Sequence, residues 1–196
     1  MTKQGSSLYF IAIVPPSPIL EQASELKNHF KEKFNSKASL NSPPHITLHM
    51  PFQWRVKREE ELVSKLELFS KNKKTFTLEL QNFSCFAPRV IFINVLENEV
   101  LRNFQLELYR FCKTELNLFN AQYKDLSFHP HLTLAFRDLK KPMFEKAWEE
   151  FSEKKLSCSF AVERFTLLKH NGKIWESFRE FFCKGSNRLK IQASQS

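Results

Sequence analysis

Glycine is scarce in this sequence: only Gly5, Gly172 and Gly185 occur among its 196 residues. A phosphate-binding P-loop or a dinucleotide-binding turn needs several glycines within a few positions, because only glycine lets the backbone approach the phosphates closely. Glycines this far apart cannot build either device. ATP-driven chemistry or dinucleotide binding through these two devices is therefore excluded.

Paired cysteines and long apolar runs are also missing. The four cysteines are widely separated and form no Cys-x-x-Cys pair, which argues against a zinc knuckle or a redox motif and favours a reducing cytoplasm. The apolar stretch at residues 8–14 is cut short by Pro15 and Pro16, and no basic run or cleavage site marks it as a targeting segment. We therefore expect a cytoplasmic protein with no membrane contact.

Positive charge and phenylalanine are in surplus. Thirty Lys and Arg against 21 Asp and Glu give a formal net charge of +9, which favours polyanionic partners such as RNA or nucleotides but also serves solubility. Twenty-one phenylalanines against three tyrosines and three tryptophans predict a phenylalanine-packed core, with a few rings left for base stacking. The length suits one domain or two closely packed lobes.

The order of apolar periodicities repeats along the chain. Strands are predicted at 8–14, 45–50, 75–86, 90–96, 129–136 and 156–168, and helices at 19–37, 57–72, 99–118 and 142–151. Both halves therefore read strand, helix, strand, helix, strand, which indicates an internal duplication. An Asn-Gly turn at 171–172 then leads into a last strand at about 174–183. We expect the α+β class: one bilobal domain over 1–196, with repeats at about 8–86 and 89–168 that share a sheet-lined groove.

Two matching histidine motifs occupy equivalent places in the two repeats. One reads His-Ile-Thr-Leu from His45 and the other reads His-Leu-Thr-Leu from His131, and each directly follows a proline. Side chains alternate between the faces of a strand, so His45 and Thr47 share one face while the aliphatic residues point into the core. His131 and Thr133 repeat this arrangement. A pseudo-twofold between the lobes would bring both pairs to a common cleft.

This set of side chains suits the in-line cleavage of a phosphodiester. The reaction needs a base for the entering oxygen and an acid for the leaving oxygen, and histidine, with an ordinary pKa of about 6.5, can fill either part. The hydroxyls of Thr47 and Thr133 can donate hydrogen bonds to the non-bridging oxygens. A single histidine on a strand is usually a packing or surface residue. Two matched pairs, however, are hard to explain by packing, so we predict that His45 and His131 are catalytic.

The two motifs, their spacing and the duplicated element order resemble the 2H phosphoesterase superfamily, and within it the bacterial 2'-5' RNA ligase-like branch. The resemblance covers nearly the whole chain. It implies a bilobal fold with two antiparallel sheets facing a central cleft and helices outside. It also implies metal-independent activity, without a cofactor, on 2',3'-cyclic phosphates, 2',5'-linked oligonucleotides or RNA ends. Reversal of the same chemistry joins a 2',3'-cyclic end to a 5'-hydroxyl without ATP.

Residues beyond the motifs are candidates for substrate binding. Arg137 follows the second motif and could hold a phosphate through a bidentate contact, although a solvent-exposed arginine is an equal alternative. Phe52 and Trp54, after the first motif, and Phe136, after the second, could stack on a base, although a place in the core or at the rim is the simpler interpretation of each. His29 and His170 are expected to be ordinary helix and turn residues.

Several alternatives stay open at this point. By alternation His49 and His129 share faces with His45 and His131, so a metal site of four imidazoles is one alternative to the metal-free site. The substrate could be a 2',3'-cyclic RNA end or nucleotide, a 2',5'-oligonucleotide or another cyclic nucleotide. A different class of function is a non-catalytic RNA-binding module, in which the groove binds RNA but does not cleave it. A purely structural role would leave the paired motifs unexplained. We expect a monomer.

Overall fold

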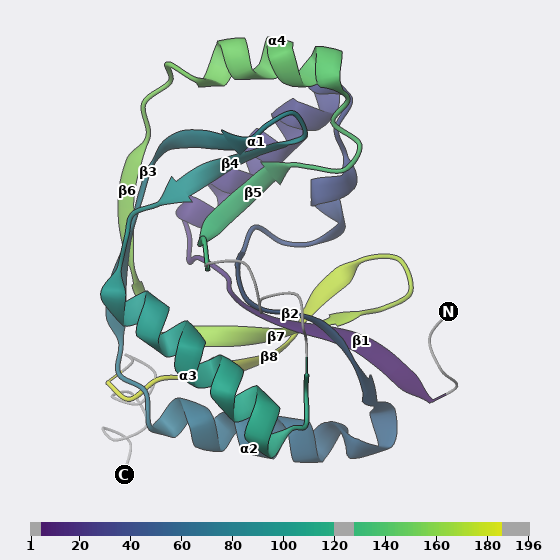
Figure 1. Cartoon of the computed structure of the whole chain (residues 1–196), viewed down its shortest axis with the longest axis vertical. Coiled ribbons are helices and arrows are strands. Elements are labelled where there is room, and N and C mark those ends of the chain that lie inside the picture. The colour runs from purple at the N-terminus through teal and green to yellow at the C-terminus, as the bar shows by residue number, and fades with distance from the viewer. Residues whose placement is uncertain (1–4, 120–127, 186–196) are drawn as a thin grey trace.

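The computed structural model describes residues 5–119 and 128–185 (Figure 1). In these ranges the chain forms four α-helices and eight strands. The helices are α1 (Ile19–Phe34), α2 (Glu59–Lys71), α3 (Glu99–Glu115) and α4 (Lys141–Phe151), with short 3-10 turns η1 (Ala38–Asn41) and η2 (Val56–Arg58). The strands are β1 (Ser6–Ile13), β2 (Ile46–Arg55), β3 (Phe76–Phe86), β4 (Val90–Val95), β5 (His131–Ala135), β6 (Ser157–Val162), β7 (Arg164–His170) and β8 (Trp175–Phe182). No helix of the described part has the length and apolar character needed to cross a bilayer.

All eight strands belong to one curled antiparallel sheet in the order β6-β3-β4-β5-β2-β1-β7-β8. The mixed α and β class is confirmed, and the two antiparallel sheets that the resemblance implied are joined into one. The central strands β2 and β5 approach closely enough to pair at Ile46 and Leu132, and this pair joins the two halves. The halves are therefore continuous, and their junction is narrow.

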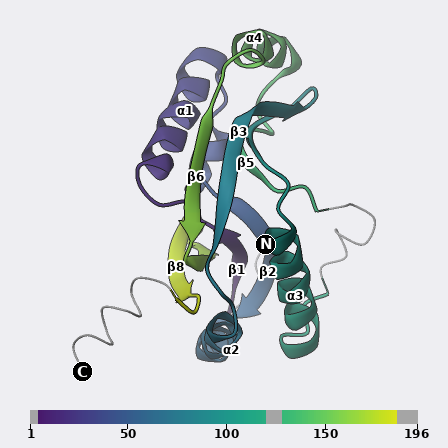
Figure 2. The same ribbon diagram turned by 90° about the vertical axis from the view of Figure 1, so that its left-hand side faces the viewer.

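The helices cross between the halves of the sheet. Helix α1 follows β1 in the chain but packs against β5 and α4 of the other half. In the same way, α3 follows β4 in the chain but packs against β2 and α2. Figures 1 and 2 show the same division, with α1 and α4 beside β3, β5 and β6, and α2 and α3 at the opposite end of the molecule. Strand β3 also pairs with β4 and β6 rather than with β1 or β2. The expected sequence repeats are thus interlocked in space.

The segment expected to form one strand at 156–168 forms two. Strand β6 pairs with β3 at one edge of the sheet, and β7 pairs with β1 in the other half, so the chain changes halves at Glu163. Burial alternates along β6 but is continuous from Phe165 to Leu168 in β7. This change in pattern accompanies the move from an edge strand to a strand covered on both faces.

Phenylalanine fills the core between the sheet and the helices, as predicted. Phe30 of α1 stacks on Phe151 of α4 at a centroid distance of 4.8 Å, and Phe165 stacks on Phe181 at 5.1 Å in the other half. A smaller apolar cluster of Phe10, Ala12 and Leu168, flanked by Val14 and Trp175, lies apart from this main core. The smaller cluster belongs to the face of the sheet that carries the histidine motifs.

Candidate active site

The central strand pair anchors both motifs through its core face. Ile46 of β2 pairs with Leu132 of β5, and both side chains are completely buried, as are Leu48 and Leu134 two residues further along each strand. These four aliphatic residues hold the motifs against the main core. The residues between and before them must then point to the opposite face.

On that opposite face, the register places the four motif side chains together. Ile46 pairs with Leu132 in an antiparallel bridge, so the residues that flank this pair, His45 and Thr47 on one side and His131 and Thr133 on the other, share this face. The two imidazoles are close enough for the charge of His131 to lower the pKa of His45. A single phosphate between them could contact one imidazole on each side.

Both imidazoles make the same backbone contact. Nδ1 of His45 lies 2.7 Å from the carbonyl oxygen of Pro43, and Nδ1 of His131 lies 2.7 Å from the carbonyl oxygen of His129. A carbonyl oxygen can only accept, so Nδ1 carries the proton in each ring. In the neutral form Nε2 is then left with the lone pair. Each histidine is therefore oriented to accept a proton at Nε2, or to donate one from Nε2 after protonation.

Burial keeps both rings neutral in the free protein. Desolvation, together with the charges of Lys27 and His131, lowers the pKa of His45 to about 4, although the hydrogen bond to Pro43 opposes the shift. Desolvation also lowers the pKa of His131. The Phe10 ring lies 4.8 Å from the His45 ring, and the Phe92 ring lies 4.9 Å from the His131 ring. These two phenylalanines keep water from one side of each imidazole.

A cavity of about 220 Å³ opens beside His45 and Thr47. Phe10, Trp175 and His170 form a continuous aromatic wall, with ring centroids 4.7 Å apart for the first pair and 4.9 Å for the second. The other lining residues are Ala38, Asn41, Ser42, Met50, Pro51, Phe136, Arg137 and Lys173. His131 and Thr133 stand one strand away on β5 rather than in this wall. His170, expected to be an ordinary turn residue, is therefore part of the cavity.

Two cations of this cavity have no ion-pair partner within residues 5–119 and 128–185. Arg137 lies at the end of β5 with a left-handed φ of 60°, and its guanidinium sits 5.0 Å from the Phe136 ring. Lys173 lies in the turn between β7 and β8 and makes no salt bridge with the described residues. Both charges are thus available to an anion. The structure brings Phe136 and Arg137 to His45 and Thr47, as expected.

Phe52 and Trp54 do not line the cavity, so the candidate role of these rings in base stacking is wrong and the simpler interpretation, a place in the core, is correct. Both side chains belong to the main hydrophobic core. Phe52 is 5% exposed and packs 6.0 Å from the Tyr9 ring. The indole Nε1 of Trp54 donates to the carbonyl oxygen of Arg58 at 2.7 Å. Their aromatic surface stabilises the fold and is not available for base stacking.

The four-imidazole metal alternative is also not formed. A register shift between β1 and β2 pairs Ile11 with His49 but Ala12 with Thr47, so one extra residue turns His49 into the core. His49 is only 1% exposed, whereas His129 is exposed, with its ring 6.2 Å from that of His131. Across the described parts of the chain, no three His, Cys, Asp or Glu residues group closely enough to bind a metal ion.

Lys27 was not among the functional candidates predicted from the sequence, although it supports the wall of the cavity. It is 2% exposed, and its Nζ donates to the carbonyl oxygens of Ser39 at 2.9 Å and Ser42 at 3.0 Å. Burial lowers its pKa to about 7. The buried residues of α1 are Ile19, Ala23, Lys27, Phe30 and Phe34. A lysine at a position of this apolar helical stripe was the signal that could have revealed it.

A carboxylate holds the other end of the segment that Lys27 supports. Asp138 accepts hydrogen bonds from the hydroxyl of Ser36 and from the backbone N–H groups of Lys37 and Ala38, each at 2.9 Å. The segment at 36–42 is therefore fixed at both ends by buried or partly buried polar contacts. Three of its residues line the cavity. Lys27 and Asp138 thus shape the cavity wall without belonging to it.

We expect Lys27→Met to abolish a pH dependence of stability. In the unfolded chain a lysine ionises near pH 10.4, but folded Lys27 has a pKa of about 7. Above pH 7 the unfolded state binds a proton that the folded state lacks, so the free energy of unfolding rises with pH. Urea unfolding at pH 7.0, 7.8 and 8.5 should show this rise in the wild type and a smaller rise in Lys27→Met. The exposed Lys31→Met is the control, and equal slopes in all three proteins would contradict the assignment.

Comparisons with known proteins agree with this fold. The sequence profile of the 2'-5' RNA ligase superfamily matches residues 15–174, so the chain belongs to this family. A protein of Geobacillus kaustophilus, provisionally named a phosphoesterase, is 27% identical over 185 residues, covering 92% of this chain and 99% of its own length. A similarly named protein of Bacillus pumilus is 28% identical over 150 residues, or 76% of this chain and 82% of its own.

Two solved structures share the fold. TT0787 of Thermus thermophilus superposes with a TM-score of 0.66 at 19% identity, covering 92% of this chain and all of that one. LigT of E. coli, solved with 3'-AMP, superposes with a TM-score of 0.64 at 19% identity, covering 91% and 99% of the two chains. The family and the fold define a phosphoesterase of the 2H type.

Proposed function

We propose that the protein is a metal-independent phosphodiesterase that acts on RNA ends or nucleotides carrying a 2',3'-cyclic phosphate, and that it can run the reverse 2'-5' ligation. The observation that carries the proposal is the pair of imidazoles next to the bridge between the two central strands, each with Nδ1 bonded to a carbonyl and each two residues before a threonine. No metal is needed, because histidine supplies both acid and base.

In the proposed hydrolysis, a water oxygen attacks phosphorus while Nε2 of one histidine takes the water proton. The bond from phosphorus to one ribose oxygen breaks, and Nε2–H of the other histidine protonates that oxygen. Thr47 and Thr133 donate hydrogen bonds to the non-bridging oxygens, where negative charge grows in the transition state. Ligation follows the same steps, with a 5'-hydroxyl oxygen in place of the water oxygen: it attacks phosphorus and loses its proton to the base, the bond from phosphorus to the 3'-oxygen breaks, and the acid protonates that oxygen, which leaves a 2'-5' linkage.

Substrate binding prepares the acid. Both histidines are neutral in the free protein because burial lowers their pKa values. A phosphate anion between the rings favours the charged imidazolium and so raises the pKa of either ring. One proton taken up with the substrate then leaves one neutral base and one charged acid. Arg137 and Lys173 add positive charge on the His45 side, which favours an anionic ligand.

The fold neighbour LigT supports a nucleotide as ligand. LigT was solved with 3'-AMP, and further LigT structures contain phosphate, ATP or NADP+. These ligands share phosphate groups and a nucleoside, which is the chemistry that an aromatic wall next to unpaired cations can bind. We carry this ligand class over to the present chain as part of the proposal.

We also propose that the enzyme works as a monomer in the reducing cytoplasm. Cys85, Cys112, Cys158 and Cys183 are all free thiols. Burial raises the pKa of Cys112 to about 12 and that of Cys183 to about 11, so these two thiols stay protonated and unreactive.

A substrate panel tests the proposed function. The purified protein is incubated with 2',3'-cyclic nucleotides, 2',5'-linked dinucleotides and 3',5'-linked dinucleotides, and the products are separated by chromatography. We expect turnover of the cyclic nucleotides, and we expect EDTA to leave the rate unchanged. Turnover of 2',5'-linked dinucleotides alone would favour a 2',5'-oligonucleotide phosphodiesterase. Tight, salt-sensitive RNA binding without product from any substrate of the panel would contradict the enzyme hypothesis and favour an RNA-binding module.

A further inference from the structure

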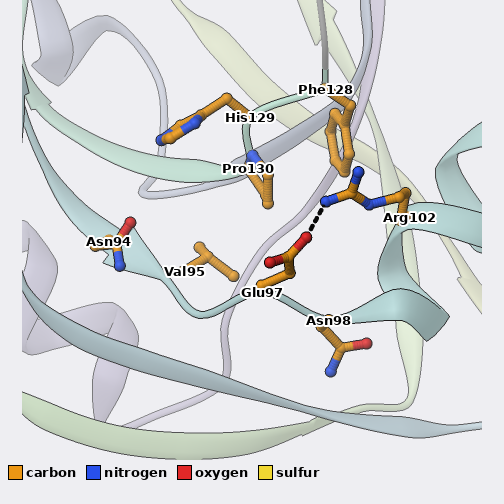
Figure 3. Close-up of a pocket in the computed structure, with 8 residues that line it drawn as sticks. All are labelled: Asn94, Val95, Glu97, Asn98, Arg102, Phe128, His129 and Pro130. Atoms are coloured by element: carbon orange, nitrogen blue, oxygen red, sulfur yellow. Dashed lines mark hydrogen bonds and ion pairs between the residues drawn. The ribbon is translucent and has the colours of Figure 1, made fainter.

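A second cavity, of about 310 Å³, lies on the His131 side of the site. It is formed by the end of β4, the turn into α3 and the residues that precede β5. The lining residues are Asn94, Val95, Glu97, Asn98, Arg102, Phe128, His129 and Pro130. Figure 3 shows Asn94 on one side of the cavity and Phe128 with the Glu97–Arg102 pair on the other, with Pro130 between them.

This cavity adjoins the histidine pair. Asn94 pairs directly with His131 in the register of β4 and β5, so the two side chains emerge next to each other on the same face. The His129 ring, at the rim of the cavity, lies 6.2 Å from the His131 ring. A ligand whose phosphate sits between His45 and His131 can therefore extend into this cavity with its next chemical group.

The second cavity differs in charge from the first. Glu97 and Arg102 form an ion pair, so their charges cancel within the wall. The side chain of Asn98 is occupied, since its Oδ1 accepts from the N–H of Leu101 at 2.9 Å and its Nδ2 donates to the carbonyl of Thr77 at 3.0 Å. The Asn94 amide forms no hydrogen bond with the residues that the structure describes, 5–119 and 128–185. The wall thus offers one open amide and no surplus cation.

We propose that the second cavity binds the nucleoside attached through its 5'-oxygen to the reacting phosphorus, with the base against Phe128 and its edge hydrogen-bonded to Asn94. A nucleobase is neutral, has both donors and acceptors on its edge, and stacks on aromatic rings. A phosphate group would instead need the free positive charge that only the first cavity has. The volume is at the lower end of the range of small-molecule sites.

The subsite rests on the proposed function and separates two substrate classes that the family resemblance already implies. A 2',3'-cyclic mononucleotide fills only one cavity, whereas a 2',5'-linked dinucleotide fills both. In the dinucleotide, the 3'-hydroxyl oxygen attacks phosphorus and loses its proton to the base. The bond from phosphorus to the 5'-oxygen breaks, and the acid protonates that oxygen. The products are a 2',3'-cyclic phosphate and a free nucleoside, which leaves from the second cavity.

Two variants and one control test this subsite by comparing kcat/KM on a 2',5'-linked diadenosine with kcat/KM on 2',3'-cyclic AMP. We expect Phe128→Ala to lower the dinucleotide value about 10- to 100-fold, from the loss of stacking. We expect Asn94→Ala to lower it about tenfold, from the loss of a hydrogen bond. Both losses should exceed the losses on the cyclic substrate and fall mainly on KM. Asn103→Ala, on the exposed face of α3, should leave both values unchanged.

The outcomes separate this proposal from the proposed function. If the wild type turns over neither substrate, the proposed function fails and the subsite proposal fails with it. If the wild type turns over cyclic AMP but Asn94→Ala and Phe128→Ala affect both substrates equally, only the nucleoside subsite is overturned. Circular dichroism confirms the fold of each variant. Should Phe128→Ala fail to fold, the partly exposed Asn94→Ala decides the question alone.

Discussion

Replacing either His45 or His131 by alanine should lower turnover about 10²–10⁴-fold while the protein remains folded. In the proposed mechanism each imidazole supplies one of the two proton transfers, and the neighbouring backbone carbonyl leaves only Nε2 for this task. Both side chains are only partly buried, so we expect their removal to leave the fold intact. The measurement is kcat on a 2',3'-cyclic nucleotide, with thermal unfolding as the test of folding.

His29→Ala is the matched control for these two variants. His29 lies on α1, contacts Glu150 at 2.9 Å and lines neither of the two cavities of the site. Its removal should leave kcat unchanged. Full activity in His45→Ala or His131→Ala would refute acid and base catalysis by this pair. The double variant should lose little more than a single variant, because residues that act as one unit are not additive.

Removing the threonine hydroxyls should have the second largest effect. Thr47→Val and Thr133→Val keep the shape of the side chain but remove the donor that faces the phosphate. The loss of one donor to developing negative charge typically lowers kcat about 10²–10³-fold. Steady-state kinetics on the same cyclic nucleotide, with kcat and KM reported separately, give the size of the loss.

Serine at the same two positions provides the control. Thr47→Ser and Thr133→Ser restore the hydroxyl but lack the methyl group, so most of the activity should return. If the valine variants lose no more activity than the serine variants, the hydroxyls do not contact the phosphate and the threonines are only packing residues. A rise in KM without a fall in kcat would instead indicate ground-state binding.

The parts of the site that depend on local pattern could be predicted from the sequence. Alternation along a strand is enough to place His45 and Thr47 on one face, and the repeated motif indicates that His131 and Thr133 do the same. The register shift that buries His49 could not be predicted, because it depends on how β1 pairs with β2. The same limit applies to Phe52, whose place in the core is determined by tertiary packing.

Long-range pairing accounts for the remaining differences. The pairing of β2 with β5 joins residues far apart in the chain, and no local signal specifies it. The buried Lys27 is stabilised by two carbonyls of a later segment, so its role is visible only in the folded chain. The charged pair that neutralises the second cavity depends in the same way on the turn between β4 and α3.

Each histidine motif lies on a strand that is packed against a helix from the other half of the chain. Helix α1, which the first half of the chain supplies, supports β5 with His131, and α3, which the second half supplies, supports β2 with the first motif. Unfolding of α1 would remove the packing behind His131, and unfolding of α3 would remove the packing behind the first motif. We therefore expect the proposed activity to require the intact chain, and we expect either half, when separated from the other, to be inactive.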